Sequence, residues 1–176
     1  MGMIEKYEPR DLGIKVFPTN IKTQDKARLR ASLAPNVIVD YKFVVPEWGQ
    51  QNFAADDFVE AWLGPKKLGV KALTTQHLLG APYFKSVTDS EIIVEWQQLA
   101  SHARKVAGED YSHPHCKIGE TSDGRSYMQQ TFVKVDGQWR ISVIKPEKLP
   151  TQYPQSKLHF TPLFMQPSNP SFQTKH

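Results

Sequence analysis

Residues 91–106 have the sequence EIIVEWQQLASHARKV, and this stretch decides the fold class. Apolar and polar residues alternate along it, a period of two that predicts a β-strand. A strand of this length is unusual in a globular protein and requires twisting or a bulge. One face of the strand carries Val94, Trp96, Gln98, Ala100 and His102. The polar Gln98 and the small Ala100 stand beside the histidine, where a closed core would place bulky apolar groups, and this indicates a cavity.

Helical patterns come earlier in the chain. The sequence predicts a helix over 24–34 that ends at Pro35, and a second helix over 54–63 that ends at Gly64-Pro65. Between them, residues 37–44 (VIVDYKFV) are β-branched and aromatic and predict a strand. One face of that strand would carry Val37, Val39, Tyr41 and Phe43.

Strands and hairpins dominate the second half. Residues 74–87 predict one or two strands broken near Gly80-Ala81-Pro82. Asp123-Gly124 and Asp136-Gly137 are hairpin dipeptides and bracket a strand over 125–135. A last strand, 138–144, ends at Lys145-Pro146. Helices followed by hairpin-linked strands predict an α+β fold, in which a strongly twisted antiparallel sheet forms a cone-shaped half-barrel over the N-terminal helices.

Length and composition describe an ordinary globular chain. Its 176 residues predict a single domain, with an irregular arm over 1–23 and a tail or lid, rich in proline and aromatic residues, over 147–176. The net charge of +4 is scattered, which argues against nucleic-acid binding. A lone cysteine, Cys116, fits a reducing compartment, and the absence of a spanning segment or secretory leader leads us to expect a cytoplasmic protein without membrane contact.

Two histidines could carry chemistry. His77, in the stretch TTQHLLG, and His102 lie on successive predicted strands, and Tyr41 comes from an earlier one. Ser126 shares a strand face with Met128 and Gln130. Two imidazoles with a phenol and a hydroxyl can move protons near neutral pH. The alternative, that each histidine is only a hydrogen-bonded or surface group, stays open at this point.

Other reaction classes lack a motif. Ser112–Cys116 (SHPHC) holds two histidines, but the proline between them marks a loop and no further ligand pattern completes a zinc site. The sequence gives no sign of a base positioned to activate Cys116, so an inert thiol is expected there. There is no glycine-rich phosphate loop, no GxSxG elbow and no HExxH motif. We therefore expect no metal and no cofactor.

Five segments of the chain resemble scytalone dehydratase, the fungal melanin-pathway family. That family belongs to the cone-shaped α+β barrels that also include ketosteroid isomerase, and the resemblance spans about residues 28–146 in the family's order. The segments are LRASLAPNVIVDYKFV (29–44), ADDFVEAWL (55–63), LTTQHLLGA (73–81), the strand of His102, and FVKVDGQWRISVIKP (132–146).

The resemblance implies a role for each matching residue. Tyr41 matches a tyrosine that orders a water on the substrate carbonyl, and His77 and His102 match the histidines that transfer protons. Ser126 matches a serine that supports the histidines. Further substrate-binding positions are implied or expected at Val44, Gln98, Ala100 and Met128, at Lys22, and at Phe160 and Phe164, which match two phenylalanines that close the pocket.

Two departures change the expected substrate. Ile21 and Lys22 stand where the family has a Tyr-Asp pair whose aspartate orients the first histidine, and Met128 replaces an asparagine that binds a substrate hydroxyl. Loss of polar partners weakens discrimination for the same polar substrate. We therefore expect a hydrophobic, aromatic or polycyclic small molecule rather than scytalone itself.

The sequence thus predicts a cofactor-free dehydratase (lyase), or an isomerase or cyclase, for a polyketide- or terpenoid-derived intermediate of fungal secondary metabolism. Two alternatives stay open: a pericyclase that templates a cycloaddition, and a non-catalytic small-molecule-binding or docking module. The family resemblance implies a homo-oligomer, a trimer by analogy, with a dimer also possible.

Overall fold

The computed structural model describes residues 25–65, 67–113 and 115–148. The described chain forms two α-helices, a short 3-10 helix (η1) and a seven-stranded sheet. In chain order the elements are α2 (Lys26–Ser32), β1 (Leu33–Asp40), η1 (Pro46–Trp48), β2 (Gln50–Ala54), α3 (Ala55–Trp62), β3 (Leu73–Leu79), β4 (Tyr83–Val87), β5 (Glu91–Lys105), β6 (Ile118–Val135) and β7 (Gln138–Lys148).

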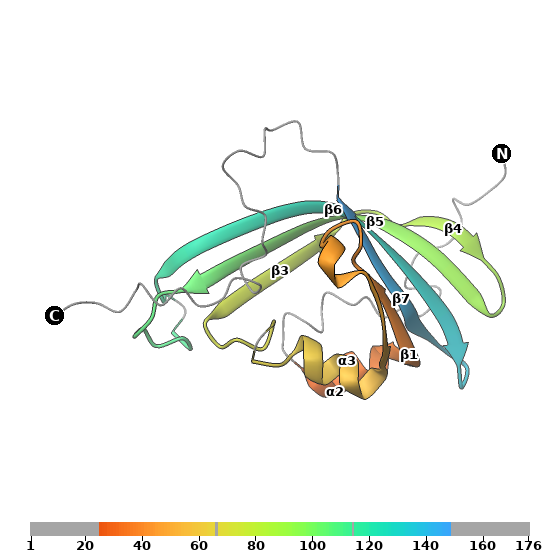
Figure 1. The fold of residues 1–176 in the computed structure, drawn as a ribbon, viewed down its shortest axis with the longest axis horizontal. Coiled ribbons are helices and arrows are strands. Elements are labelled where there is room, and N and C mark those ends of the chain that lie inside the picture. Colours follow the sequence, from red (N-terminus) through yellow and green to blue (C-terminus); the bar gives the residue numbers. More distant parts are fainter. Residues whose placement is uncertain (1–24, 66, 114, 149–176) are drawn as a thin grey trace.

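The sheet is mixed and strongly curved. Its strand order is β2-β1-β7-β6-β5-β3, with β4 paired to β5, so the path does not close on itself. The sheet bends over α2 and α3, which lie below it in Figure 1. The pairing of β1 with β7 is parallel, so the expectation of a purely antiparallel sheet was wrong at this place. The α+β class and the cone-shaped half-barrel are confirmed.

The core lies between the helices and the concave face of the sheet. Phe58 of α3 is fully buried and stacks on Trp62, with 4.7 Å between ring centroids and 21° between planes. Leu29 of α2 is also fully buried. The sheet side of the core consists of Val37 and Val39 from β1, Ile92, Val94 and Trp96 from β5, Phe132 from β6, and Ile141 and Ile144 from β7.

Both helices begin where local chemistry favours a start. The Asp25 carboxylate accepts a hydrogen bond from the backbone N–H of Arg28 at 2.8 Å and caps α2. Asp56 and Asp57 lie in the first turn of α3, where the positive end of the helix dipole favours carboxylates. The predicted end of the first helix at Pro35 was late, because α2 ends at Ser32 and Pro35 lies within β1.

The first strand begins and ends earlier than predicted. The chain turns after Asp40, and the backbone N–H groups of Val44 and Val45 both bond to the carbonyl of Tyr41 at 2.8 Å. Phe43 therefore does not continue the inward face of β1, and its side chain is 54% exposed. The turn leads through η1 into β2, a mostly exposed strand without an apolar pattern, and neither element was predicted.

Asp123-Gly124 is not a hairpin turn. Both residues lie inside β6 and pair with β5, where Asp123 faces Ser101 and Gly124 faces Ala100. Gly124 is not among the glycines with positive φ, which a two-residue hairpin turn would need. β6 therefore begins at Ile118 rather than at Arg125, and β5 confirms the long strand predicted over 91–106.

Asp136-Gly137 does form the predicted hairpin. Its residues have φ of 50° and 75°, as the common two-residue turns require, and join the paired residues Val135 and Gln138. β7 continues through Pro146 to Lys148 instead of ending at Pro146. The pairing of β1 with β7 ends at Ile144, so Pro146 has a neighbouring strand only on the side of β6. The N–H that proline lacks therefore removes no hydrogen bond on the side of β1.

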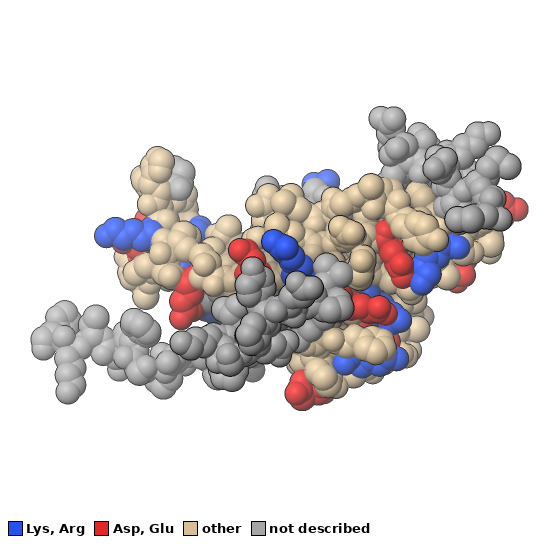
Figure 2. All heavy atoms as spheres, turned by 90° about the horizontal axis from the view of Figure 1, so that it is seen from above, with Lys and Arg blue, Asp and Glu red and all other residues tan. Residues whose placement is uncertain are grey.

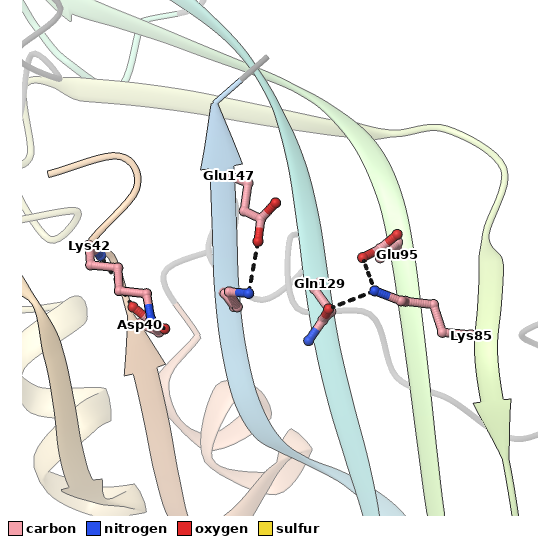
Figure 3. Close-up of polar contacts among 7 residues, drawn as sticks. Asp40, Lys42, Lys85, Glu95, Gln129 and Glu147 are labelled. Carbon is pink, nitrogen blue, oxygen red and sulfur yellow. Dashed lines mark hydrogen bonds and ion pairs between the residues drawn. The ribbon is translucent and has the colours of Figure 1, made fainter. Parts of the chain in front are cut away.

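Charged side chains lie on the face of the sheet opposite the core. Lys85 of β4 contacts Glu95 of β5 at 2.8 Å and Gln129 of β6 at 3.4 Å, and Lys145 pairs with Glu147 at 2.8 Å along β7 (Figure 3). Exposed pairs of this kind contribute about 0–1 kcal/mol each. Basic and acidic side chains are interspersed over the face shown in Figure 2.

The helices described here are all too short and too polar to cross a lipid bilayer.

Candidate active site

His77 and His102 meet on the concave face of the sheet. β3 and β5 are antiparallel neighbours in which Thr75 faces His102 and His77 faces Ala100. Residues two apart on a strand point to the same side, so both imidazoles share one face. Their ring centroids are 5.4 Å apart and their planes are nearly perpendicular, at 87°. The structure thus brings together the two histidines that the sequence analysis paired.

Small residues lie across the strands from His77. Ala100 on β5 is its direct neighbour, and Gly124 on β6 is the neighbour of Ala100. Directly opposite residues have Cβ atoms about 5 Å apart, so large side chains here would cover the imidazole. This row contributes one imidazole, one methyl group and one hydrogen. It therefore places no bulky side chain of β5 or β6 beside His77.

Burial keeps both imidazoles neutral. It lowers the pKa of His77 to about 4, with a further contribution from the charge of His102. Burial also lowers the pKa of His102, although the negative charge of Asp123 acts in the opposite direction and raises it. Among the described residues, Nε2 of His77 is buried and has no hydrogen-bond partner. A neutral imidazole offers one donor and one acceptor nitrogen, so the pair can both take and give a proton.

The lowered pKa of His77 predicts a loss of stability in acid. Between about pH 6.5 and about pH 4 the unfolded state binds a proton that folded His77 does not, so the free energy of unfolding falls as the pH falls through this range. At 1.36 kcal/mol per pKa unit, the loss from His77 reaches about 3 kcal/mol. Urea unfolding at several pH values measures it.

Two variants isolate the contribution of His77. His77→Gln should flatten the acid dependence, whereas His113→Gln, at an exposed histidine in the loop before β6, should keep the wild-type profile. A wild-type profile in His77→Gln would show that His77 is not held neutral by the fold.

The predicted substrate-binding residues of β5 and β6 lie on the same face as the histidines. Gln98 faces Ser126, and its Nε2 lies 3.5 Å from the serine Oγ, a long hydrogen bond. Trp96 faces Met128 in the next row. Gln98 and Met128 are both buried. Along this face the imidazoles are therefore followed by a polar row, Gln98 and Ser126, and then by an apolar row, Trp96 and Met128.

Tyr41 lies at the end of β1, packed between tryptophans. Its ring centroid is 5.4 Å from that of Trp48 and 5.7 Å from that of Trp62. Burial raises the pKa of the Tyr41 hydroxyl, which therefore stays protonated and can donate a hydrogen bond. Within the described part of the chain, no hydrogen bond or ring contact joins Tyr41 to either histidine.

Val44 is the one other predicted position that the structure describes. Val44 is half-buried in the turn after β1, where its N–H bonds to Tyr41, so it supports that turn rather than forming a strand wall. Lys22, Phe160 and Phe164 lie outside the described residues.

A tryptophan–lysine cluster surrounds Tyr41 and was not predicted from the sequence. Nζ of Lys67 lies 4.5 Å from the ring centroid of Trp48 and 4.1 Å from that of Trp62, and partial burial lowers the pKa of its ammonium. Stacking of a cation on two aromatic faces fixes the loop after α3 beside the ring of Tyr41. Trp62 falls within the helix predicted over 54–63, and no spacing rule connects it with Trp48 or Lys67.

Metal-ligand residues do not gather in the described part of the chain: no group of three or more His, Cys, Asp or Glu side chains is placed to share an ion. The rings of His113 and His115, from the SHPHC stretch, lie 5.7 Å apart in an exposed loop.

The fold defines the class of protein. A nuclear transport factor 2 (NTF2-like) superfamily protein from Salmonella enterica has a solved structure that matches with a TM-score of 0.58 at 14% identity, covering 83% of this chain and 92% of that chain. At such low identity the likeness concerns the fold alone. The chain therefore shares the fold of that protein.

Sequence similarity defines the family. The scytalone dehydratase family model matches residues 15–162. The "Dehydratase cfoI" of Aspergillus candidus is 47% identical over 123 residues, which are 70% of each chain. The "Scytalone dehydratase-like protein Arp1" of Metarhizium anisopliae is 35% identical over 137 residues, 76% of this chain and 67% of the relative. The chain belongs to the scytalone dehydratase family.

Proposed function

We propose that this protein is a dehydratase of fungal secondary metabolism that removes water from a polyketide- or terpenoid-derived intermediate without a cofactor. The observation that carries the proposal is the pair of neutral imidazoles 5.4 Å apart on the concave face, with His102 buried and His77 half-buried, beside a row of small residues. Membership of a family whose relatives are named dehydratases supports the reaction type.

The reaction needs one proton acceptor and one proton donor. One histidine takes the proton from the carbon next to a carbonyl, and the electron pair of the broken C–H bond forms the new C=C bond. The C–O bond to the leaving hydroxyl then breaks, and the abstracted proton passes from the resulting imidazolium to the hydroxyl, directly or through the second imidazole, so that water leaves and both histidines end neutral. Either His77 or His102 can be the histidine that takes the proton from carbon.

Tyr41 completes the proposed mechanism. Its protonated hydroxyl stabilises the negative charge that develops on the carbonyl oxygen, directly or through a water molecule. Because the hydroxyl is a neutral donor, this contribution does not require a second charged group in the pocket.

The substrate is expected to be hydrophobic and aromatic or polycyclic. Met128 stands where the family has a polar asparagine, and it faces the indole of Trp96 across β5 and β6. This row favours a flat apolar ring system over a small polyhydroxylated one.

The low pKa of His77 favours a second candidate, an isomerase or cyclase of the same substrate class. An imidazole with a pKa of about 4 is a weak base. Ring closure or isomerisation of an already activated intermediate needs less basicity than removal of an unactivated proton.

The proposal is tested by the metabolite that accumulates when the gene is deleted. Purified protein should convert that metabolite into a product lighter by one water, measured by mass spectrometry. A product of unchanged mass would assign the isomerase or cyclase instead. Unchanged metabolite that binds the protein tightly would assign a binding module.

The role of Tyr41 has its own test. Tyr41→Phe should lower turnover by about 10²–10³-fold, as removal of an oxyanion donor does in other enzymes, with little change in melting temperature. Tyr127→Phe, on β6 with its side chain 40% exposed, is the matched control and should turn over like wild type. Wild-type turnover in Tyr41→Phe would remove the phenol from the mechanism.

A further inference from the structure

Gln130 is the most deeply buried polar side chain of the inward face. It lies on β6, faces Val94 on β5 and Ile144 on β7, and is 1% exposed. Among the described residues neither its amide nitrogen nor its amide oxygen has a hydrogen-bond partner. Both of its cross-strand neighbours are aliphatic, so the fold surrounds a full amide with apolar groups.

The fold alone gives no reason for an amide at this position. A buried polar group without a partner costs about 1–3 kcal/mol relative to a paired one. A methionine of similar length would fill the same volume without that cost. A polar residue that weakens the fold in this way is typical of a functional position.

Gln130 is on the same face as the histidines but at a distance from them. The row of His77 crosses β6 at Gly124, six residues before Gln130, which corresponds to about 20 Å along the strand. Between them lie Ser126 and then Met128, which faces Trp96. A polar row, an apolar row and a buried amide therefore follow one another along the inward face.

We propose that Gln130 is a specificity-determining residue that hydrogen-bonds a carbonyl or hydroxyl group at the far end of an elongated aromatic ligand, whose reactive end lies at His77 and His102. The inference rests on the proposed function, because it places the reactive end at the histidines. It adds that the ligand carries oxygen at both ends and is apolar in the middle.

Met128 makes this access possible. It lies two residues from Gln130 on the same face and is unbranched, so its side chain can move aside from the amide at low energetic cost. The amide breaks no hydrogen bond within the described chain when a ligand arrives. The hydrogen bond gained on binding is therefore not offset by one that is lost.

The test compares two probes that differ by one hydroxyl: 2-hydroxyanthraquinone and anthraquinone. Both are shorter than the distance of about 20 Å between the histidine row and Gln130, so they report on the Gln130 end of the face alone. Tryptophan fluorescence quenching gives the two dissociation constants, since Trp96 lies in the intervening row. Wild type should bind the hydroxylated probe about tenfold more tightly, the ratio that one hydrogen bond of about 1.4 kcal/mol supplies. In Gln130→Met the ratio should fall below about twofold, and the melting temperature should rise.

Gln129→Met is the matched control. It is the same substitution one residue away, on the opposite face of the sheet, where Gln129 contacts Lys85 (Figure 3). It should change neither the probe ratio nor the melting temperature by much. Equal binding of both probes by wild type, an unchanged ratio in Gln130→Met, or a lowered melting temperature of that variant would each overturn the proposal. Since binding and melting are measured without turnover, failure here is separate from failure of the dehydratase proposal.

Discussion

His77→Ala and His102→Ala should each lower turnover by about two to four powers of ten, because removal of a positioned acid or base has an effect of this size. The two imidazoles are 5.4 Å apart, with His102 buried and His77 half-buried, so water does not readily replace the missing group. Single-turnover kinetics on the metabolite that accumulates in the deletion strain measure the chemical step separately from product release.

His115→Ala is the control for this experiment. His115 lies in the exposed loop before β6 and should keep wild-type turnover. The double variant His77→Ala/His102→Ala should be little slower than either single variant if the histidines act as one unit. A loss of less than about threefold in both single variants would reject the proton-transfer pair. It would favour an enzyme that only holds its substrate in a reactive shape.

Phe58→Ala should lower the free energy of unfolding by about 3–5 kcal/mol, the range for phenylalanine-to-alanine changes in a protein core. Phe58 is fully buried, stacks on Trp62 and meets the ring of Phe53 edge-on at 5.9 Å. Its removal leaves a cavity between α3 and the sheet that the two remaining rings cannot fill. Urea unfolding monitored by circular dichroism gives the value.

Phe43→Ala makes the same chemical change at an exposed site. Phe43 is 54% exposed and its ring contacts are with Lys42 and Lys145, whose Nζ atoms lie 5.1 and 5.4 Å from the ring centroid. Exposed cation–π contacts contribute about 0.5–1 kcal/mol each, so the variant should lose little stability. Similar losses in both phenylalanine variants would mean that α3 does not anchor the core.

Periodicity predicted the parts of the fold where burial alternates regularly. The long strand around Trp96 and the helix around Phe58 were both found because one face of each is apolar. β2 was missed because it is mostly exposed and has no such pattern. The hairpin predicted at Asp123-Gly124 was wrong because the same dipeptide also occurs inside a long paired strand. There Gly124 is a small residue opposite Ala100.

The same physics explains what could be predicted of the site. His77 and His102 were paired because a period of two places both on inward faces, and the register between β3 and β5 brings them together. Tyr41 was placed on a strand, whereas it lies in the turn that follows. Its contacts with Trp48 depend on how that turn folds back, and neighbouring residues do not reveal this.

The parallel pairing of β1 with β7 affects how the protein is made. Val39 of β1 is the partner of Ile144 of β7, so the sheet cannot be completed until β7 has left the ribosome. Until then one edge of β1 has no strand beside it, and exposed strand edges promote aggregation. The antiparallel strands from β3 to β6 can pair earlier during synthesis, because each lies next to a near neighbour in the chain. Folding of this sheet is therefore expected to finish only after β7 has been synthesised, and β1 is the last strand to gain its second neighbour.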